Sequence, residues 1–355
     1  MKKVLILILT IILSLSLFAC GGEKDSFSTG NFLPEIEGST GYEKLVYSVS
    51  ETGVSADSPY AQEGTLALVA ERLAIDTSVI MPSFSIKDNE FHVDFNNEIP
   101  VSKKYIVLSS TLEFGGDQMQ SYTICNPEFS PLYSFKSLII KSEKVAWTGK
   151  EEDKPNCVSY YMFTTYTEGT EKATSVVLRQ KEYGQTDYKE WEKIDMNYDS
   201  ISGGTSVFWD TNQMYYAIRG MNTLHEDNFQ YSFFTPMAIE KGTKHVIATS
   251  KNGQSAERDT FPYIKNKYES KPDANFTYTL VSIVPSGAPV TGSGIQVYYS
   301  EQALHSKTQQ DLTAPARCPR VPILIMENYS ANTTGTQTNP RGAIIYRLID
   351  VVSEK

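Results

Sequence analysis

The sequence predicts a mainly β protein: a large curved antiparallel sheet or open β-barrel with one or two short helices. Stretches in which apolar and polar residues alternate recur along the chain, and Gly, Asn and Asp punctuate them. Aromatic residues make up 12% of the chain, with 22 Tyr and 16 Phe. Alternation with period two, rich in Tyr, Thr, Val and Phe, is typical of antiparallel strands. Strands with one apolar face must wrap round a core, as a barrel, a sandwich or a curved sheet.

The first 19 residues have the pattern of a lipoprotein signal peptide. A basic head, Lys2-Lys3, precedes an apolar run from Val4 to Phe18, which is the order of a secretory signal. The run is shorter than the roughly 20 residues that span a bilayer comfortably. Leu17-Phe18-Ala19-Cys20 resembles the bacterial lipobox. That resemblance implies that a diacylglyceryl group is attached to the Cys20 thiol and that Cys20 becomes the new N-terminus. An ordinary signal peptide that ends in cysteine and an uncleaved N-terminal anchor are the alternatives.

Residues 20–35 are small and polar and are expected to form a flexible tether. Residues 36–355 are then one β-rich extracytoplasmic domain or two joined β halves. Because residues 1–19 hold two lysines and no acid, the remainder carries 30 basic and 42 acidic residues, a net charge of −12. With no long basic run, nucleic acid is not an expected partner.

The strands are expected in order along the chain. The stretch from Lys104 to Phe114 alternates, breaks at Gly115-Gly116 and resumes from Met119 to Ile124, which predicts a hairpin. The same pattern predicts further strands at 158–167, 175–181, 276–284, 294–299 and 343–352. Thr65 to Leu73 fits either a helix or a strand.

The clearest helix is predicted from Asp210 to Met221. Asp210 or Thr211 can cap its start and Gly220 can close its end, while Met214, Tyr215, Ile218 and Met221 share one face. Arg219 is the polar residue on this helix with the strongest claim to a role. It either reaches water along its apolar stem, pairs with a buried acid to stabilise the fold, or contacts a ligand. Arg219 and Tyr215 are therefore the candidate binding residues.

Three cysteines remain besides Cys20, namely Cys125, Cys157 and Cys318. They allow at most one disulfide, and Cys125 with Cys157 is the candidate pair, although spacing alone does not choose among the three pairings. The alternative is that all three cysteines are reduced. Outside the cytoplasm a bridge is permitted, and no Cys or His spacing indicates zinc.

Searches for catalytic motifs find none that is complete. The four histidines are scattered, and His225-Glu226-Asp227 is the most reactive local group. The stretch Asp195 to Asp199 begins like a calcium loop but has Ser200 and Ser206 where that loop needs Gly and an acid. Gly-x-Ser-x-Gly is absent, and Gly292-Ser293-Gly294 lacks a phosphate-loop lysine. No catalytic residue, metal site or cofactor is therefore expected.

Several segments resemble the bacterial domain-of-unknown-function family 3108, whose members are exported β-rich proteins. The segments that carry the resemblance are 208–221, 126–134, 295–300, 320–323 and 343–348. The insertion from Ser306 to Cys318 departs from the family's pattern. The resemblance implies a curved antiparallel sheet and brings no catalytic residues.

Together these observations predict a cell-envelope lipoprotein whose domain lies outside the cytoplasm and acts as a non-catalytic binding or scaffold protein. Its expected partners are the membrane, through lipid on Cys20, and an apolar or sugar ligand or an envelope protein. The alternative is an envelope hydrolase that uses a pair of its scattered carboxylates.

Overall fold

A computed structural model describes residues 41–52, 63–139, 159–167, 172–180, 188–197, 206–220, 230–237, 242–257, 260–267, 276–285, 294–301, 304, 320–328 and 343–352. The expected signal peptide, Cys20 and the tether lie outside these residues, as do Cys157, Cys318 and His225.

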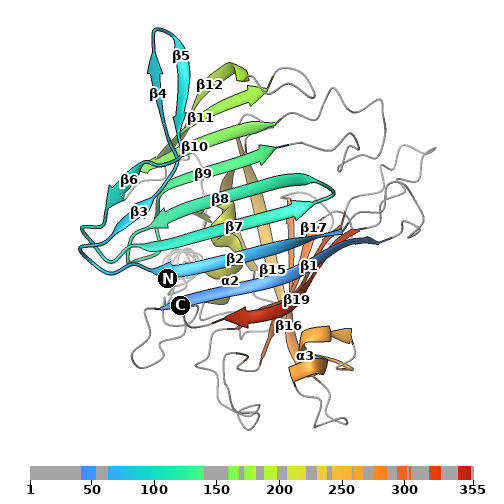
Figure 1. The fold of residues 1–355 in the computed structure, drawn as a ribbon. Helices are drawn as coiled ribbons and strands as arrows, with labels where there is room; N and C mark the ends of the chain where they lie inside the picture. The colour runs from blue at the N-terminus through green and yellow to red at the C-terminus, as the bar shows by residue number, and fades with distance from the viewer. Residues whose placement is uncertain are drawn as a thin grey trace, which may run out of the picture.

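Fifteen strands of the described residues form one continuous sheet, which does not close by hydrogen bonds into a full barrel (Figure 1). Their order across the sheet is β12-β11-β10-β9-β8-β7-β2-β1-β19-β18-β17-β16-β15-β14-β13. The first eight are β12 (Tyr188–Asn197), β11 (Lys172–Gln180), β10 (Tyr160–Thr167), β9 (Pro131–Ile139), β8 (Asp117–Cys125), β7 (Ile106–Phe114), β2 (Glu63–Arg72) and β1 (Tyr42–Thr52). The others are β19 (Ala343–Val352), β18 (Pro322–Asn328), β17 (Gly294–Ser300), β16 (Phe276–Pro285), β15 (Gly242–Ala256), β14 (Gln230–Met237) and β13 (Ser206–Phe208).

The expectation of a large antiparallel sheet is confirmed. Neighbouring strands run antiparallel throughout the sheet except for β13 and β14, which are parallel. The strands predicted around residues 106–125, 160–180, 276–300 and 343–352 are all present. Thr65 to Leu73, which fitted a helix or a strand, lies almost wholly in β2, because that segment pairs with β1 on one side and β7 on the other.

The predicted hairpin between β7 and β8 turns at Gly115 and Gly116. Their φ angles are 60° and 93°. A two-residue turn whose central residues both have positive φ matches the twist of the flanking strands, and glycine adopts that conformation without steric cost.

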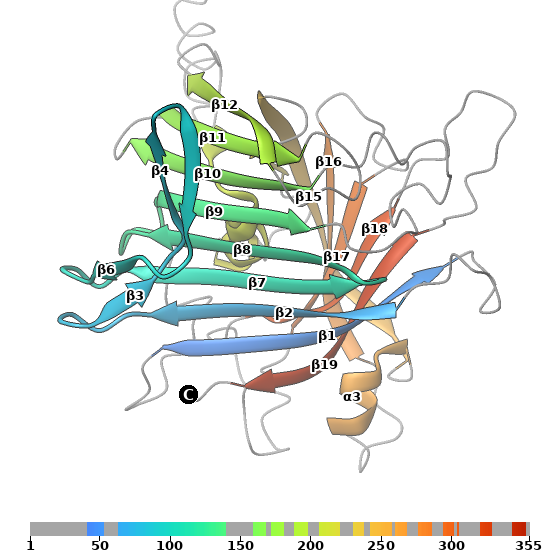
Figure 2. The same cartoon turned by 45° about the horizontal axis from the view of Figure 1, so that its top comes forward.

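The sheet bends so that β12–β1 form one wall and β19–β13 form a second wall across from it (Figure 2). A 3₁₀ helix, η3 (Thr211–Gln213), continues into α2 (Met214–Gly220), which lies between the two walls (Figure 1). A second short helix, α3 (Pro262–Lys267), packs near β19. The principal hydrophobic core fills the space between the walls and includes Leu45, Tyr47, Val297, Tyr299 and Tyr346.

A second apolar cluster lies on the outer face of the first wall. There an arm of two small sheets, β3 (Ser78–Ile80) with β6 (Glu98–Pro100) and β4 (Ser83–Lys87) with β5 (Glu90–Asp94), leaves the main sheet. Phe84 and Phe91 of the arm stack at 5.1 Å between ring centroids, and Phe84 also packs on Phe163 of β10. The arm therefore covers apolar residues that point away from the barrel interior.

Candidate ligand-binding cavity

The pleat of the first wall places side chains of two kinds in the interior. Leu66, Leu112, Met119, Leu138 and Tyr160 lie opposite one another on successive strands from β2 to β10 and form an apolar row. The next inward position along each strand is Ser110 on β7, Ser121 on β8 and Lys136 on β9. One step further come Thr123, Ser134, Thr164 and Ser175 on β8 to β11. We call these last seven residues the polar band.

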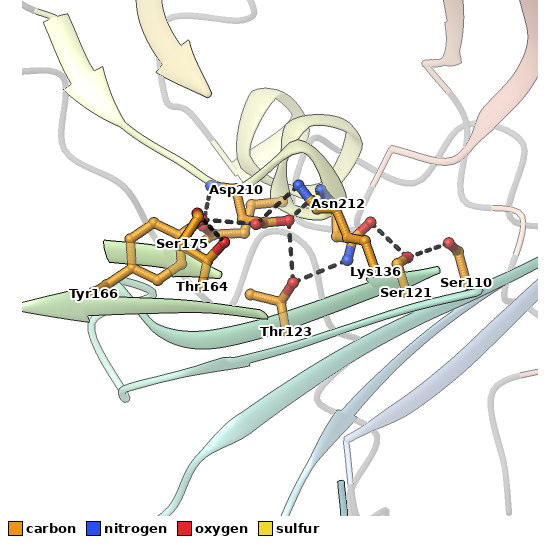
Figure 3. A network of polar contacts seen from close by, with 10 residues as sticks. Ser110, Ser121, Thr123, Lys136, Thr164, Tyr166, Ser175, Asp210 and Asn212 are labelled. Carbon is orange, nitrogen blue, oxygen red and sulfur yellow. Dashed lines mark hydrogen bonds and ion pairs between the residues drawn. The ribbon is translucent and has the colours of Figure 1, made fainter. Parts of the chain in front are cut away.

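Asp210 binds η3 to the polar band. As the residue before the helix, it accepts a hydrogen bond from the Asn212 amide at 3.0 Å, and its own backbone amide donates to the Gln213 side-chain oxygen at 2.9 Å. This capping box confirms the predicted start of the helix. The carboxylate also reaches the sheet, where it accepts bonds from Thr123 at 3.2 Å and from the Tyr166 hydroxyl at 2.7 Å. Figure 3 shows this carboxylate at the centre of the network.

Lys136 supplies the positive charge that Asp210 requires. Its ammonium lies 3.1 Å from the Asp210 carboxylate, and the Asp210 side chain is fully buried. Burial by itself raises the pKa of Asp210, but the Lys136 charge and the hydrogen bonds from Asn212 and Tyr166 outweigh it, so that the pKa lies below its ordinary value. The residue is therefore a carboxylate at neutral pH.

The network extends along η3 to the serines of the band. The Asn212 side chain donates to Thr123 at 2.9 Å and accepts from the Ser121 hydroxyl at 2.6 Å. Ser121 in turn hydrogen-bonds Ser110. Buried polar groups that are satisfied in this way hold a helix in one position against a sheet.

Arg219, near the other end of α2, forms an ion pair with a buried acid. Its guanidinium lies 2.5 Å from the Glu43 carboxylate of β1, and both side chains are fully buried. It also donates to the Arg320 carbonyl at 3.1 Å and lies 4.9 Å from the centroid of the Tyr216 ring. Of the three readings of Arg219, the structure therefore shows the pairing with a buried acid.

A cavity of about 380 Å³ lies in the barrel interior beside the apolar row. The first wall contributes the apolar row with Ser110, Ser121 and Lys136, and η3 and α2 contribute Asn212, Met214 and Tyr215. The second wall contributes Ile295, Glu327, Ile344 and Tyr346. The volume is within the roughly 300–1,000 Å³ range of small-molecule sites, which are mostly apolar with a few placed polar groups.

The candidate binding residues are thus separated. Tyr215 lines the cavity, where burial and the nearby Glu327 charge raise the pKa of its hydroxyl. Arg219 does not line it. The predicted helical face is confirmed for Met214, Tyr215 and Ile218, but Tyr216 and Ala217 are buried as well. The helix is buried on several sides because it lies inside the barrel, which its sequence did not indicate.

Cys125 is a free thiol at the inward side of β8 and is fully buried. Burial, and then the charge of Asp210, raises its pKa, which makes it a poor nucleophile. The free thiol contradicts the candidate disulfide between Cys125 and Cys157, because Cys125 forms no bridge in the structure. Cys157 itself lies outside the described residues.

Sequence reasoning missed Lys136, Glu43 and Glu327, the charged residues that matter most in the interior. Lys136 and Glu327 each occur in an otherwise apolar or hydroxyl-bearing strand segment, at a position whose alternation points inward. A single charged residue at such an inward position could have indicated a buried charge in the interior.

Among the described residues no group of three or more His, Cys, Asp and Glu is placed to hold a metal ion. His92 is exposed, with Glu90 3.9 Å away. Within the same residues, no helix has the length and apolar character needed to cross a membrane.

Comparison with known proteins gives one distant structural likeness to report. No family model matches the chain and no curated protein matches it, so the resemblance to family 3108 stays a prediction. The crystal structure of a β-barrel-like protein from Brucella abortus, of the domain of unknown function DUF1849, is 7% identical. The likeness covers 88% of this chain and 97% of that one, with a TM-score of 0.42.

Proposed function

We propose that this chain is a lipoprotein of the cell envelope that binds a small, mainly apolar ligand inside its open barrel. The observation that carries the proposal is the cavity of about 380 Å³ between the apolar row and α2. A well-packed protein interior has few voids larger than a water molecule. A space of this size, with apolar walls and a few polar groups, has the make-up of a ligand site.

The polar contacts around the cavity support a fixed site. Asp210 and Asn212 attach η3 to the polar band, and Arg219 attaches the end of α2 to β1. One wall of the cavity is thus held at both ends by buried polar contacts, which keeps the site open before ligand arrives.

Native mass spectrometry of the purified full chain in detergent tests the proposal directly. We expect a fraction of the protein to carry an added mass from a bound ligand, and we expect organic solvent to extract that ligand. A fluorescent apolar probe such as N-phenyl-1-naphthylamine then measures binding to the extracted protein.

A matched pair of variants locates the probe. Leu112→Trp adds bulk to the apolar row and is expected to weaken probe binding at least about tenfold. Thr111→Trp adds the same ring on the exposed outer face of β7 and is expected to leave binding unchanged. Equal binding by both variants, with unchanged thermal unfolding, would show that the probe lies elsewhere and would count against the proposal.

The membrane anchor has its own test. Cys20→Ser removes the thiol to which lipid would be attached, and a pair of acyl chains binds membranes durably because each buried methylene contributes about 0.8 kcal/mol. We expect the variant to move from the membrane to the soluble fraction. Sedimentation of Cys20→Ser with membranes would refute the lipid anchor and leave the cavity proposal intact.

The envelope hydrolase remains the alternative proposal. Glu43 and Asp210 each pair with a basic side chain, which leaves Asp117 and Glu327 of the cavity lining as the acids that such an activity would use.

A further inference from the structure

Glu327 is an acid on the inward side of β18. Its partners across the sheet are Ile344 of β19 and Ile295 of β17, and all three side chains line the cavity. The carboxyl group therefore lies among apolar neighbours, at the wall opposite Lys136. An acid in such a place is costly unless something compensates its charge.

Glu43 and Asp210, two other acids of the interior, each face a basic side chain, and Glu327 does not. Glu43 lies 2.5 Å from Arg219, and Asp210 lies 3.1 Å from Lys136. In the part of the chain that the structure describes, Glu327 has a hydrogen bond with Tyr346 but forms no ion pair. Burial raises its pKa, as expected of a carboxyl group that lacks a counter-charge.

The charges around the cavity add to the same conclusion. Among the described residues, the ionisable side chains that line it are Asp117, Lys136 and Glu327, besides tyrosines. Lys136, the basic residue of this described lining, already faces Asp210. Lys136 is therefore not available to balance Glu327, which disfavours a second carboxylate such as that of a fatty acid and favours a cation.

We propose that the cavity selects a cationic amphiphile, an apolar body that ends in a protonated amine, with the ammonium group against the Glu327 carboxylate. The apolar row encloses the body of the ligand. Tyr346, which hydrogen-bonds Glu327, and Tyr215 lie beside the acid, and aromatic rings attract ammonium groups. This inference rests on the proposed function, because it specifies the ligand of the same cavity.

Three probes with the same twelve-carbon chain test the head group: dodecylamine, dodecanol and dodecanoate. Each displaces N-phenyl-1-naphthylamine from the full chain at neutral pH, where a primary amine stays protonated. We expect dodecylamine to bind about tenfold or more tighter than dodecanol, and dodecanoate to bind most weakly. Added salt is expected to change this order little, because the pair is shielded from solvent.

Glu327→Gln keeps the shape of the side chain and removes its charge, so the preference for dodecylamine over dodecanol is expected to fall close to one. Glu113→Gln makes the same change on the exposed face of β7 and is expected to keep the preference. If dodecanol binds as tightly as dodecylamine to the unmodified chain, or if Glu327→Gln keeps the preference, the inference is overturned and the cavity function stands. If none of the three probes binds, the proposed function fails as well.

Discussion

The ion pair between Arg219 and Glu43 predicts a large loss of stability when one partner is removed. Arg219→Met deletes the guanidinium and keeps a long apolar side chain. Both members of the pair are fully buried and 2.5 Å apart, so the substitution leaves the Glu43 carboxylate without its cation. Removal of one partner from a buried pair costs roughly 3–5 kcal/mol, and we expect the free energy of unfolding to fall by that amount.

Urea denaturation of the full chain, followed by tryptophan fluorescence, measures this change. Arg179→Met is the matched control, because Arg179 pairs with Glu192 at 2.8 Å while the two side chains are 20% and 35% exposed. An exposed pair contributes only about 0.2–1 kcal/mol. The double variant Arg219→Met with Glu43→Leu leaves no charge behind and is expected to recover most of the lost stability. An Arg219→Met variant that costs no more than the control would refute this account of the interior.

Three further predictions concern the sheet and the other buried acids. Asp210→Asn leaves the Lys136 charge uncompensated and is expected to lower the free energy of unfolding in urea by roughly 3–5 kcal/mol. Because the folded pKa of Asp210 is lowered, the stability that its carboxylate contributes is present above about pH 3.9 and is lost as pH falls further. The variant should therefore lack this part of the loss of stability in acid. The folded pKa of Glu327 is raised, so the stability that the protonated side chain contributes is present below about pH 4.3 and is lost as pH rises through the folded pKa. Glu327→Gln is therefore expected to raise the free energy of unfolding of the ligand-free protein at neutral pH, and an unchanged or lower value would contradict this. Gly64→Ala places a methyl group 1.9 Å from the Glu113 carbonyl oxygen of the neighbouring strand, so it is expected to lower the melting temperature, and an unchanged calorimetric transition would show that β2 and β7 can separate there.

Local features of the fold could be predicted because they depend on residues close together in the chain. Alternation identified the strands, Gly115-Gly116 identified a turn that needs positive φ, and Asp210 identified the start of the helix. Each of these signals acts within a few residues, where propensity and turn chemistry are strong.

The site could not be predicted, because it depends on contacts between distant segments. Glu43 and Arg219 are 176 positions apart, and the Thr123–Asp210 hydrogen bond joins residues 87 positions apart. Which face of each strand points inward follows from the register, and a shift by one residue would have put Lys136 outside and Phe135 inside. Alternation alone does not determine which face of β9 points inward, because both faces carry apolar residues. Leu138 lies inside, and Phe135 packs under the arm.

The pairing of β1 with β19 has a consequence for how the chain acquires its structure. The first strand of the sheet is hydrogen-bonded to the last, and the Tyr47 hydroxyl bonds the Pro322 carbonyl across 275 positions of sequence. Until β19 is available, β1 has one neighbouring strand instead of two, and no strand pairing joins the second wall to the first. Long-range pairings of this kind are formed slowly, so folding is completed only after synthesis of the whole chain, and a nascent chain that stops short of residue 343 exposes an unpaired strand edge to its surroundings.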